Sequence, residues 1–151
     1  MHLTLKFLGD VPESQIAAVC RAVTEAVAPF APFDIAAVGA GAFPDTRRPR
    51  TLWIGIGRGL EELCKLQKSV DRALRKLGFP KEGRQFHPHL TIGRLRQGGD
   101  SVSQLGDLVR DLDNFDAACA TINQVTVFAS HLSKTGPTYE ALGRARLGGS
   151  E

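Results

Sequence analysis

Two short motifs hold the residues of this 151-residue chain that could do chemistry, each with one imidazole and one hydroxyl. His2 and Thr4 are separated by a single residue, and so are His89 and Thr91. Successive side chains of a β-strand point to opposite faces, so each histidine would share a face with its threonine. The duplication therefore predicts a paired site, to which two strands each give a histidine and a threonine.

Two imidazoles facing each other can act as an acid and a base near neutral pH, because the ordinary imidazole pKa is about 6.5. The hydroxyls of Thr4 and Thr91 are neutral donors that suit the oxygens of a phosphate held between the rings. In-line displacement at phosphorus needs a base on the attacking oxygen and an acid on the leaving oxygen. The pattern indicates phosphoryl chemistry without a metal, with Arg94 or Arg96 to neutralise the phosphate.

A single motif of this kind has a simpler explanation, because a lone histidine is most often a surface residue or a hydrogen-bonded core residue. His87 and His89 could suggest a metal site, but the third ligand and the carboxylate spacing of a zinc centre are missing. We therefore expect neither a metal nor a cofactor, and interpret His87 as an exposed neighbour. His131 has no partner motif and is interpreted as structural.

Three further features have competing interpretations. The pair Gly39 and Gly41 lacks the third glycine and the following helix of a nucleotide-binding loop, so it is expected to form a tight turn. The segment 47–50 contains three arginines, which are either a solvated charge run or a rim that attracts RNA phosphates. Trp53 lies within an apolar strand and is expected in the core rather than as a stacking platform.

Apolar periodicity predicts the elements that must position these residues. Strands and helices mix without strict alternation, which favours an α+β domain with antiparallel sheets. The expected strands cover 2–8, 33–38, 51–56, the second motif, 115–122, 125–132 and 138–145, and the expected helices cover 11–28, 60–77 and 101–112.

Composition limits the class of protein. A chain of 151 residues that is 42% hydrophobic suits one domain over residues 1–151, and a net charge of +3 mildly favours anionic partners. Cys20, Cys64 and Cys119 show no Cys-x-x-Cys spacing, and no apolar stretch approaches the roughly 18 residues of a membrane span. We expect a soluble, cytoplasmic protein with reduced thiols and no membrane partner.

In order along the chain, several segments resemble one family, the two-histidine phosphoesterases. Within it they are similar to the RNA 2′,3′-cyclic phosphodiesterases, also called 2′-5′ RNA ligases. The segments are HLTLKFLG at 2–9, GAFP at 41–44, RRPR at 47–50 with the following Trp53, LGF at 77–79 and PHLT at 88–91.

This resemblance implies a bilobal α+β fold, in which two pseudo-symmetric antiparallel sheets with outer helices each give one motif to a central cleft. It implies metal-independent hydrolysis of RNA 2′,3′-cyclic phosphate ends, or of small cyclic nucleotides, to 2′-phosphates, with weak 2′-5′ ligation as a second activity. His89 would be the general base on water and His2 the general acid on the 3′ oxygen. Thr4, Thr91 and Arg94 would contact the phosphate.

The chain departs from the family pattern in two places. Arg94 falls on the opposite face from His89 in a regular strand, so a bulge or twist at Gly93 is required. Family members usually carry a strand and a helix ahead of the first motif, whereas here Met1 directly precedes His2. This leaves open a non-catalytic nucleotide- or RNA-binding module that keeps the cleft. A purely structural domain would require both motifs to be coincidental.

Overall fold

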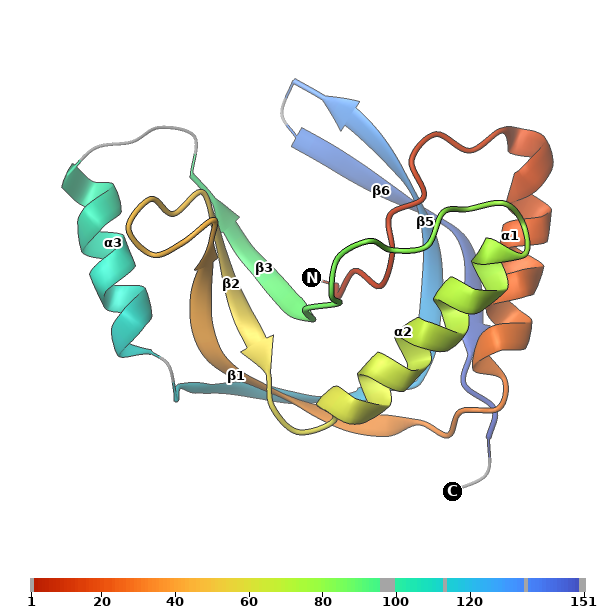
Figure 1. Ribbon diagram of the computed structural model, residues 1–151, viewed down its shortest axis with the longest axis horizontal. Coiled ribbons are helices and arrows are strands. Elements are labelled where there is room, and N and C mark those ends of the chain that lie inside the picture. Colours follow the sequence, from red (N-terminus) through yellow and green to blue (C-terminus); the bar gives the residue numbers. More distant parts are fainter. Residues whose placement is uncertain (1, 96–99, 113, 135, 150–151) are drawn as a thin grey trace. The chain divides into compact units, whose positions relative to one another are not determined.

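The computed structural model describes residues 2–95, 100–112, 114–134 and 136–149, and these form helices and antiparallel strands (Figure 1). The mixture confirms the predicted α+β class. In chain order the elements are α1 (Glu13–Val27), β1 (Phe33–Phe43), β2 (Thr51–Ile56), α2 (Leu60–Arg75), β3 (His89–Arg94), α3 (Asp100–Asp111), β4 (Asp116–Ile122), β5 (Gln124–Ser133) and β6 (Gly136–Arg146).

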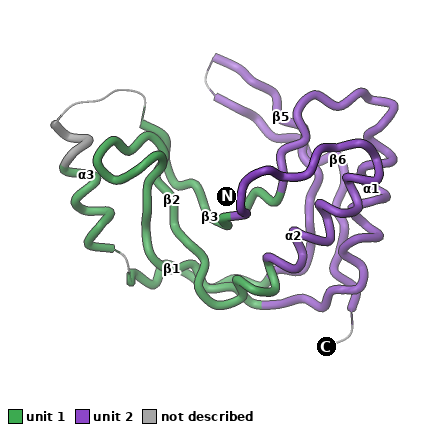
Figure 2. The backbone as a smooth tube through the Cα atoms, in the orientation of Figure 1, with its two compact units in different colours: residues 1–5, 34–63, 87–121 green, residues 6–33, 64–86, 122–151 purple. Residues whose placement is uncertain are grey.

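The chain divides into two compact units, each assembled from three separate stretches (Figure 2). Unit 1 contains residues 1–5, 34–63 and 87–121, and unit 2 contains residues 6–33, 64–86 and 122–151. The resemblance implied one motif from each lobe. Here His2 and Thr4 belong to unit 1, which also holds the second motif.

Unit 1 is built on a four-stranded sheet with the strand order β3-β2-β1-β4. The tight turn predicted from Gly39 is wrong, because β1 continues to Phe43. Gly39 has a φ of 70°, and the pairing of β1 with β2 shifts its register between Val38 and Ala40. A glycine in this left-handed conformation accommodates the extra residue of a β-bulge, so the strand bends without ending.

Unit 2 contains the β5–β6 hairpin, with α1 packed against both of its strands. Its second helix, α2, ends at Arg75, two residues before the predicted Leu77, and a turn follows up to the predicted stop at Gly78, which has a φ of 93° and donates its N–H to the carbonyl of Arg75. The apolar side chains recur at helical spacing and form the core of the unit. Its buried members are Val19, Val23, Val27, Leu66, Val70, Leu74, Ala145 and Leu147.

The segment that carries the first motif forms no strand, although alternation predicts one over 2–8. In a strand over 2–8, Lys6 would lie on the polar face with His2 and Thr4, and Phe7 on the apolar face. The structure has the reverse, since the Lys6 side chain is 4% exposed and Phe7 is 81% exposed. The cause lies in unit 2, where the Lys6 ammonium donates to Asp71 Oδ1 at 2.5 Å and to the Pro80 carbonyl at 2.7 Å. These polar contacts, rather than a strand ladder, determine which side chain turns inward.

Among the described helices, none combines the length and the apolar character that crossing a membrane requires.

Candidate active site

One face of the unit 1 sheet collects the second motif and the arginine that follows it. Residues directly opposite each other in an antiparallel pair share a face, and alternate residues along β2 share that same face. The relevant pairs between β2 and β3 are Gly55 with His89, Trp53 with Thr91, and Thr51 with Arg94. His89, Thr91 and Arg94 therefore lie on one face.

A β-bulge in β3 makes this arrangement possible. Leu52 pairs with Gly93, whereas the next residue of β2 pairs with Thr91, so Ile92 is the extra residue. The inserted residue reverses the alternation of side chains beyond it and returns Arg94 to the face of His89. The irregularity that the sequence required at Gly93 is thus present, one residue earlier.

The ring of His89 is oriented by its own chain. His89 Nδ1 lies 2.7 Å from the carbonyl oxygen of His87. A carbonyl oxygen accepts hydrogen bonds and cannot donate them, so Nδ1 carries the hydrogen. In the neutral ring this leaves the lone pair on Nε2, the nitrogen that would serve as a base.

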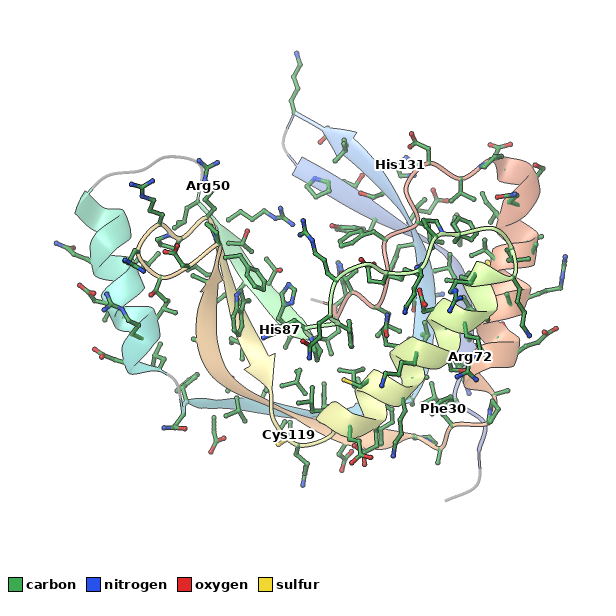
Figure 3. All side chains as sticks on the ribbon, in the orientation of Figure 1. Phe30, Arg50, Arg72, His87, Cys119 and His131 are labelled. Carbon is green, nitrogen blue, oxygen red and sulfur yellow. The ribbon has the colours of Figure 1, made fainter. Side chains whose placement is uncertain are left out.

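Aromatic side chains surround this imidazole. The Phe43 ring meets His89 edge-on at 5.0 Å between centroids, and the Trp53 ring lies 5.1 Å from His87 and 6.1 Å from His89. Trp53 was expected in the core, but its side chain is half-buried beside both histidines. Figure 3 shows His87 just before β3. Phe43 and Trp53 form one wall of the candidate site.

Sequence reasoning missed the part that His87 plays through its backbone. The residue is exposed, as expected, but its carbonyl sets the tautomer of His89 and its ring lies against Trp53. The signal was the spacing of two residues around the buried Pro88, which brings the carbonyl of residue 87 close to the ring of residue 89. Phe43 was missed because the bulge at Gly39 places it on this face.

We expect Gly41→Ala to destabilise the protein by about 1–3 kcal/mol, because a Cβ at this position would overlap the indole ring of Trp53. Displacement of that ring should also disturb the wall beside His89. Urea denaturation of the variant measures the loss. Gly93→Ala is the matched control in the same sheet, since its added Cβ would meet no described heavy atom within 4 Å apart from its own chain neighbours. Equal stability of Gly41→Ala and the wild type would contradict the expectation.

The remaining predicted residues are placed as follows. His2 is exposed and Thr4 is partly buried, and both belong to unit 1 together with β3. Arg94 is exposed, and Arg96 lies outside the described residues. In the part of the chain that the structure describes, no group of three or more His, Cys, Asp or Glu side chains is arranged to hold a metal ion.

Comparison with known proteins identifies sequence relatives of this chain. The sequence matches the model of the 2′-5′ RNA ligase superfamily over residues 1–133. An RNA 2′,3′-cyclic phosphodiesterase of Aquifex aeolicus is 36% identical over 150 residues, which cover 99% of this chain and 79% of that protein. One from Methanothermobacter thermautotrophicus is 35% identical over 147 residues, covering 97% and 78%.

Solved structures share the fold. The crystal structure of TT0787 of Thermus thermophilus has a TM-score of 0.81 at 23% identity, covering 99% of this chain and 79% of that one. Escherichia coli LigT complexed with 3′-AMP has a TM-score of 0.71 at 23% identity, covering 97% and 76%. At these identities the likeness establishes the architecture.

Proposed function

Because the chain belongs to the 2′-5′ RNA ligase superfamily, we propose that it hydrolyses RNA 2′,3′-cyclic phosphate ends to 2′-phosphate ends. Relatives that share about a third of their residues with it are named for this activity. The observation that carries the proposal is the hydrogen bond from His89 Nδ1 to the His87 carbonyl, because it leaves Nε2 with a lone pair for a water molecule.

In the proposed reaction His89 is the general base and His2 the general acid. His89 Nε2 takes a proton from water as the water oxygen bonds to phosphorus. The bond from phosphorus to the 3′ oxygen breaks on the opposite side, and His2 donates a proton to that oxygen. The products are a 2′-phosphate and a 3′-hydroxyl, and the two imidazoles exchange protons with solvent before the next cycle.

Thr91 and Arg94 support the proposal because they share the face of His89. The Thr91 hydroxyl can donate to one phosphate oxygen, and the Arg94 guanidinium can offset the negative charge of the diester and of the transition state. Thr4 would bind a further oxygen from the first motif. These residues supply an acid, a base and a positive charge, so we propose that the reaction proceeds without a metal ion or cofactor.

The second candidate is a non-catalytic module that binds a nucleotide or an RNA end without turnover. One observation favours it, because residues 2–9 form no strand, whereas the second motif lies on the paired strand β3. Thr91 and Arg94 would bind the phosphate equally well in such a module. The two candidates therefore differ in turnover rather than in affinity.

An oligoribonucleotide ending in a 2′,3′-cyclic phosphate, incubated with the protein in the presence of a chelator, distinguishes these candidates. We expect conversion to a 2′-phosphate end, which mass spectrometry and ³¹P NMR identify. Adding an oligonucleotide with a 5′-hydroxyl should give a small amount of 2′-5′-joined product, because that hydroxyl can take the place of water as the attacking group while the 3′ oxygen leaves as before. Binding without hydrolysis would instead support the non-catalytic module.

A further inference from the structure

We propose that three arginines in the loop between β1 and β2 bind the backbone phosphates of an RNA strand that leads to the cyclic end. The arginine loop consists of Arg47, Arg48 and Arg50. The protein would then prefer an RNA strand over a small cyclic nucleotide, which has no further phosphate to offer. This inference rests on the proposed function and names its substrate class.

The arginine loop lies at the end of the sheet where Arg94 is found. Phe43, at the end of β1, and Arg94, at the end of β3, both pair with Thr51 of β2. The Arg50 N–H donates to the Phe43 carbonyl at 2.8 Å, and the Arg50 carbonyl accepts from the Leu95 N–H at 2.8 Å. Arg50 thus bridges the ends of β1 and β3, and Figure 3 shows it at this end of the strands.

The backbone of the loop is held by specific contacts. Asp45 Oδ1 accepts the N–H groups of Arg48 at 2.9 Å and Arg47 at 2.7 Å. These two hydrogen bonds, chiefly the one from Arg48, lower the pKa of Asp45 below its ordinary value, because backbone N–H groups bind the ionised form of the carboxyl. The Thr46 carbonyl lies so close to Gly106 of α3 that any side chain at position 106 would collide with it. Pro49 of the loop is buried.

This fixed backbone presents the three arginine side chains to solvent. Arg47, Arg48 and Arg50 are exposed, and no ion-pair contact joins any of them to another described residue, although the Asp45 carboxylate attracts the charges of Arg47 and Arg48. The carboxylate of Asp45 directs one oxygen to backbone N–H groups. Guanidinium groups match phosphate oxygens in geometry and are always charged. Of the two interpretations that the sequence left open, an anchored loop beside Arg94 favours the phosphate-binding rim over a solvated charge run.

Binding of strand phosphates has a measurable signature in salt. Each phosphate contact with a single strand contributes about −0.7 to the slope of log affinity against log salt concentration, because a counterion is released. A cyclic mononucleotide bound at Thr91 and Arg94 makes no contact of this kind with the arginine loop. The loop should therefore steepen the salt dependence for an oligonucleotide only.

The test compares the wild type with Arg47→Gln/Arg48→Gln/Arg50→Gln on two substrates, an oligoribonucleotide with a 2′,3′-cyclic end and a 2′,3′-cyclic mononucleotide. We expect the triple variant to raise KM for the oligonucleotide about tenfold at low salt and to flatten its salt slope by up to about 2. The mononucleotide kinetics should stay unchanged. The matched control removes the same charge from exposed arginines elsewhere, in Arg21→Gln/Arg58→Gln/Arg72→Gln.

The outcomes separate this inference from the proposed function. If the triple variant, the control and the wild type hydrolyse both substrates, and KM for each substrate is the same in all three proteins, the phosphate-binding role of the arginine loop is overturned and the proposed function stands. Absence of hydrolysis would overturn the proposed function. In that case the salt slope for binding a labelled oligonucleotide ending in a 2′-phosphate, measured by fluorescence anisotropy, decides the inference. An equal slope in the wild type and the triple variant would overturn it.

Discussion

Replacing His89 with glutamine is expected to lower kcat/KM for a 2′,3′-cyclic-phosphate oligonucleotide by about a hundredfold or more, which is the usual contribution of a general base. Glutamine retains a polar side chain of similar reach but cannot accept a proton near neutral pH. The loss should appear in kcat, because the base acts in the chemical step. Single-turnover hydrolysis with saturating enzyme measures this step directly.

His87→Gln is the matched control for this prediction. Both histidines lie next to Phe43 and Trp53, but the group of residue 87 that holds His89 is a backbone carbonyl, which the substitution retains. His87→Gln should therefore keep a rate near that of the wild type. Binding of a 2′-phosphate oligonucleotide by His89→Gln shows whether the site is intact. A wild-type rate in His89→Gln would eliminate the proposed base.

Replacing Lys6 with methionine is expected to lower the free energy of unfolding by about 3–5 kcal/mol, because it leaves the Asp71 carboxylate buried without its partner. Asp71 is 8% exposed, and the Lys6 ammonium is its ion-pair partner in the structure. Methionine retains most of the volume of the lysine side chain, so the loss reports the charge. Urea denaturation at neutral pH measures it.

The double variant Lys6→Met/Asp71→Leu provides the control, because replacing both partners of a buried ion pair with apolar residues is often close to neutral. It should recover most of the stability that the single variant loses. A single variant that loses less than about 1 kcal/mol, the typical value for an exposed pair, would show that the contact is solvated in solution.

The stability that this ion pair contributes should depend on pH. Burial alone would raise the pKa of Asp71, but the hydrogen bond and charge of Lys6, with smaller contributions from the Glu82 N–H and Arg75, outweigh burial and lower the pKa below 3.8. A lowered carboxyl pKa stabilises the fold above the ordinary value, and this stabilisation is lost as the pH falls through the folded-state pKa. The difference between the wild type and Lys6→Met should therefore be largest near neutral pH and shrink below about pH 4.

Local patterns predicted the elements whose causes are local. The strand over Thr51–Ile56 has the predicted bounds, and α2 ends before Gly78 because a glycine in the left-handed conformation is a strong stop signal. The second motif lies on a strand, as alternation required. For these segments the neighbouring residues in the sequence were sufficient to predict the secondary structure.

Predictions failed where the cause lies far along the chain. The strand expected over 2–8 is absent, because Lys6 turns inward to meet Asp71, a residue 65 positions away. The irregularity required near Gly93 is present, but its exact position, with Ile92 as the extra residue, is defined only by the pairing of β3 with β2. Alternation assigns faces correctly within an unbroken ladder, and a single inserted residue reverses every assignment beyond it.

Trp53 is the single tryptophan of the chain, and it lies beside the rings of His87 and His89. Its fluorescence emission is therefore an intrinsic optical reporter of the candidate site, free of background from other indoles. The same signal can follow ligand entry in real time without a label.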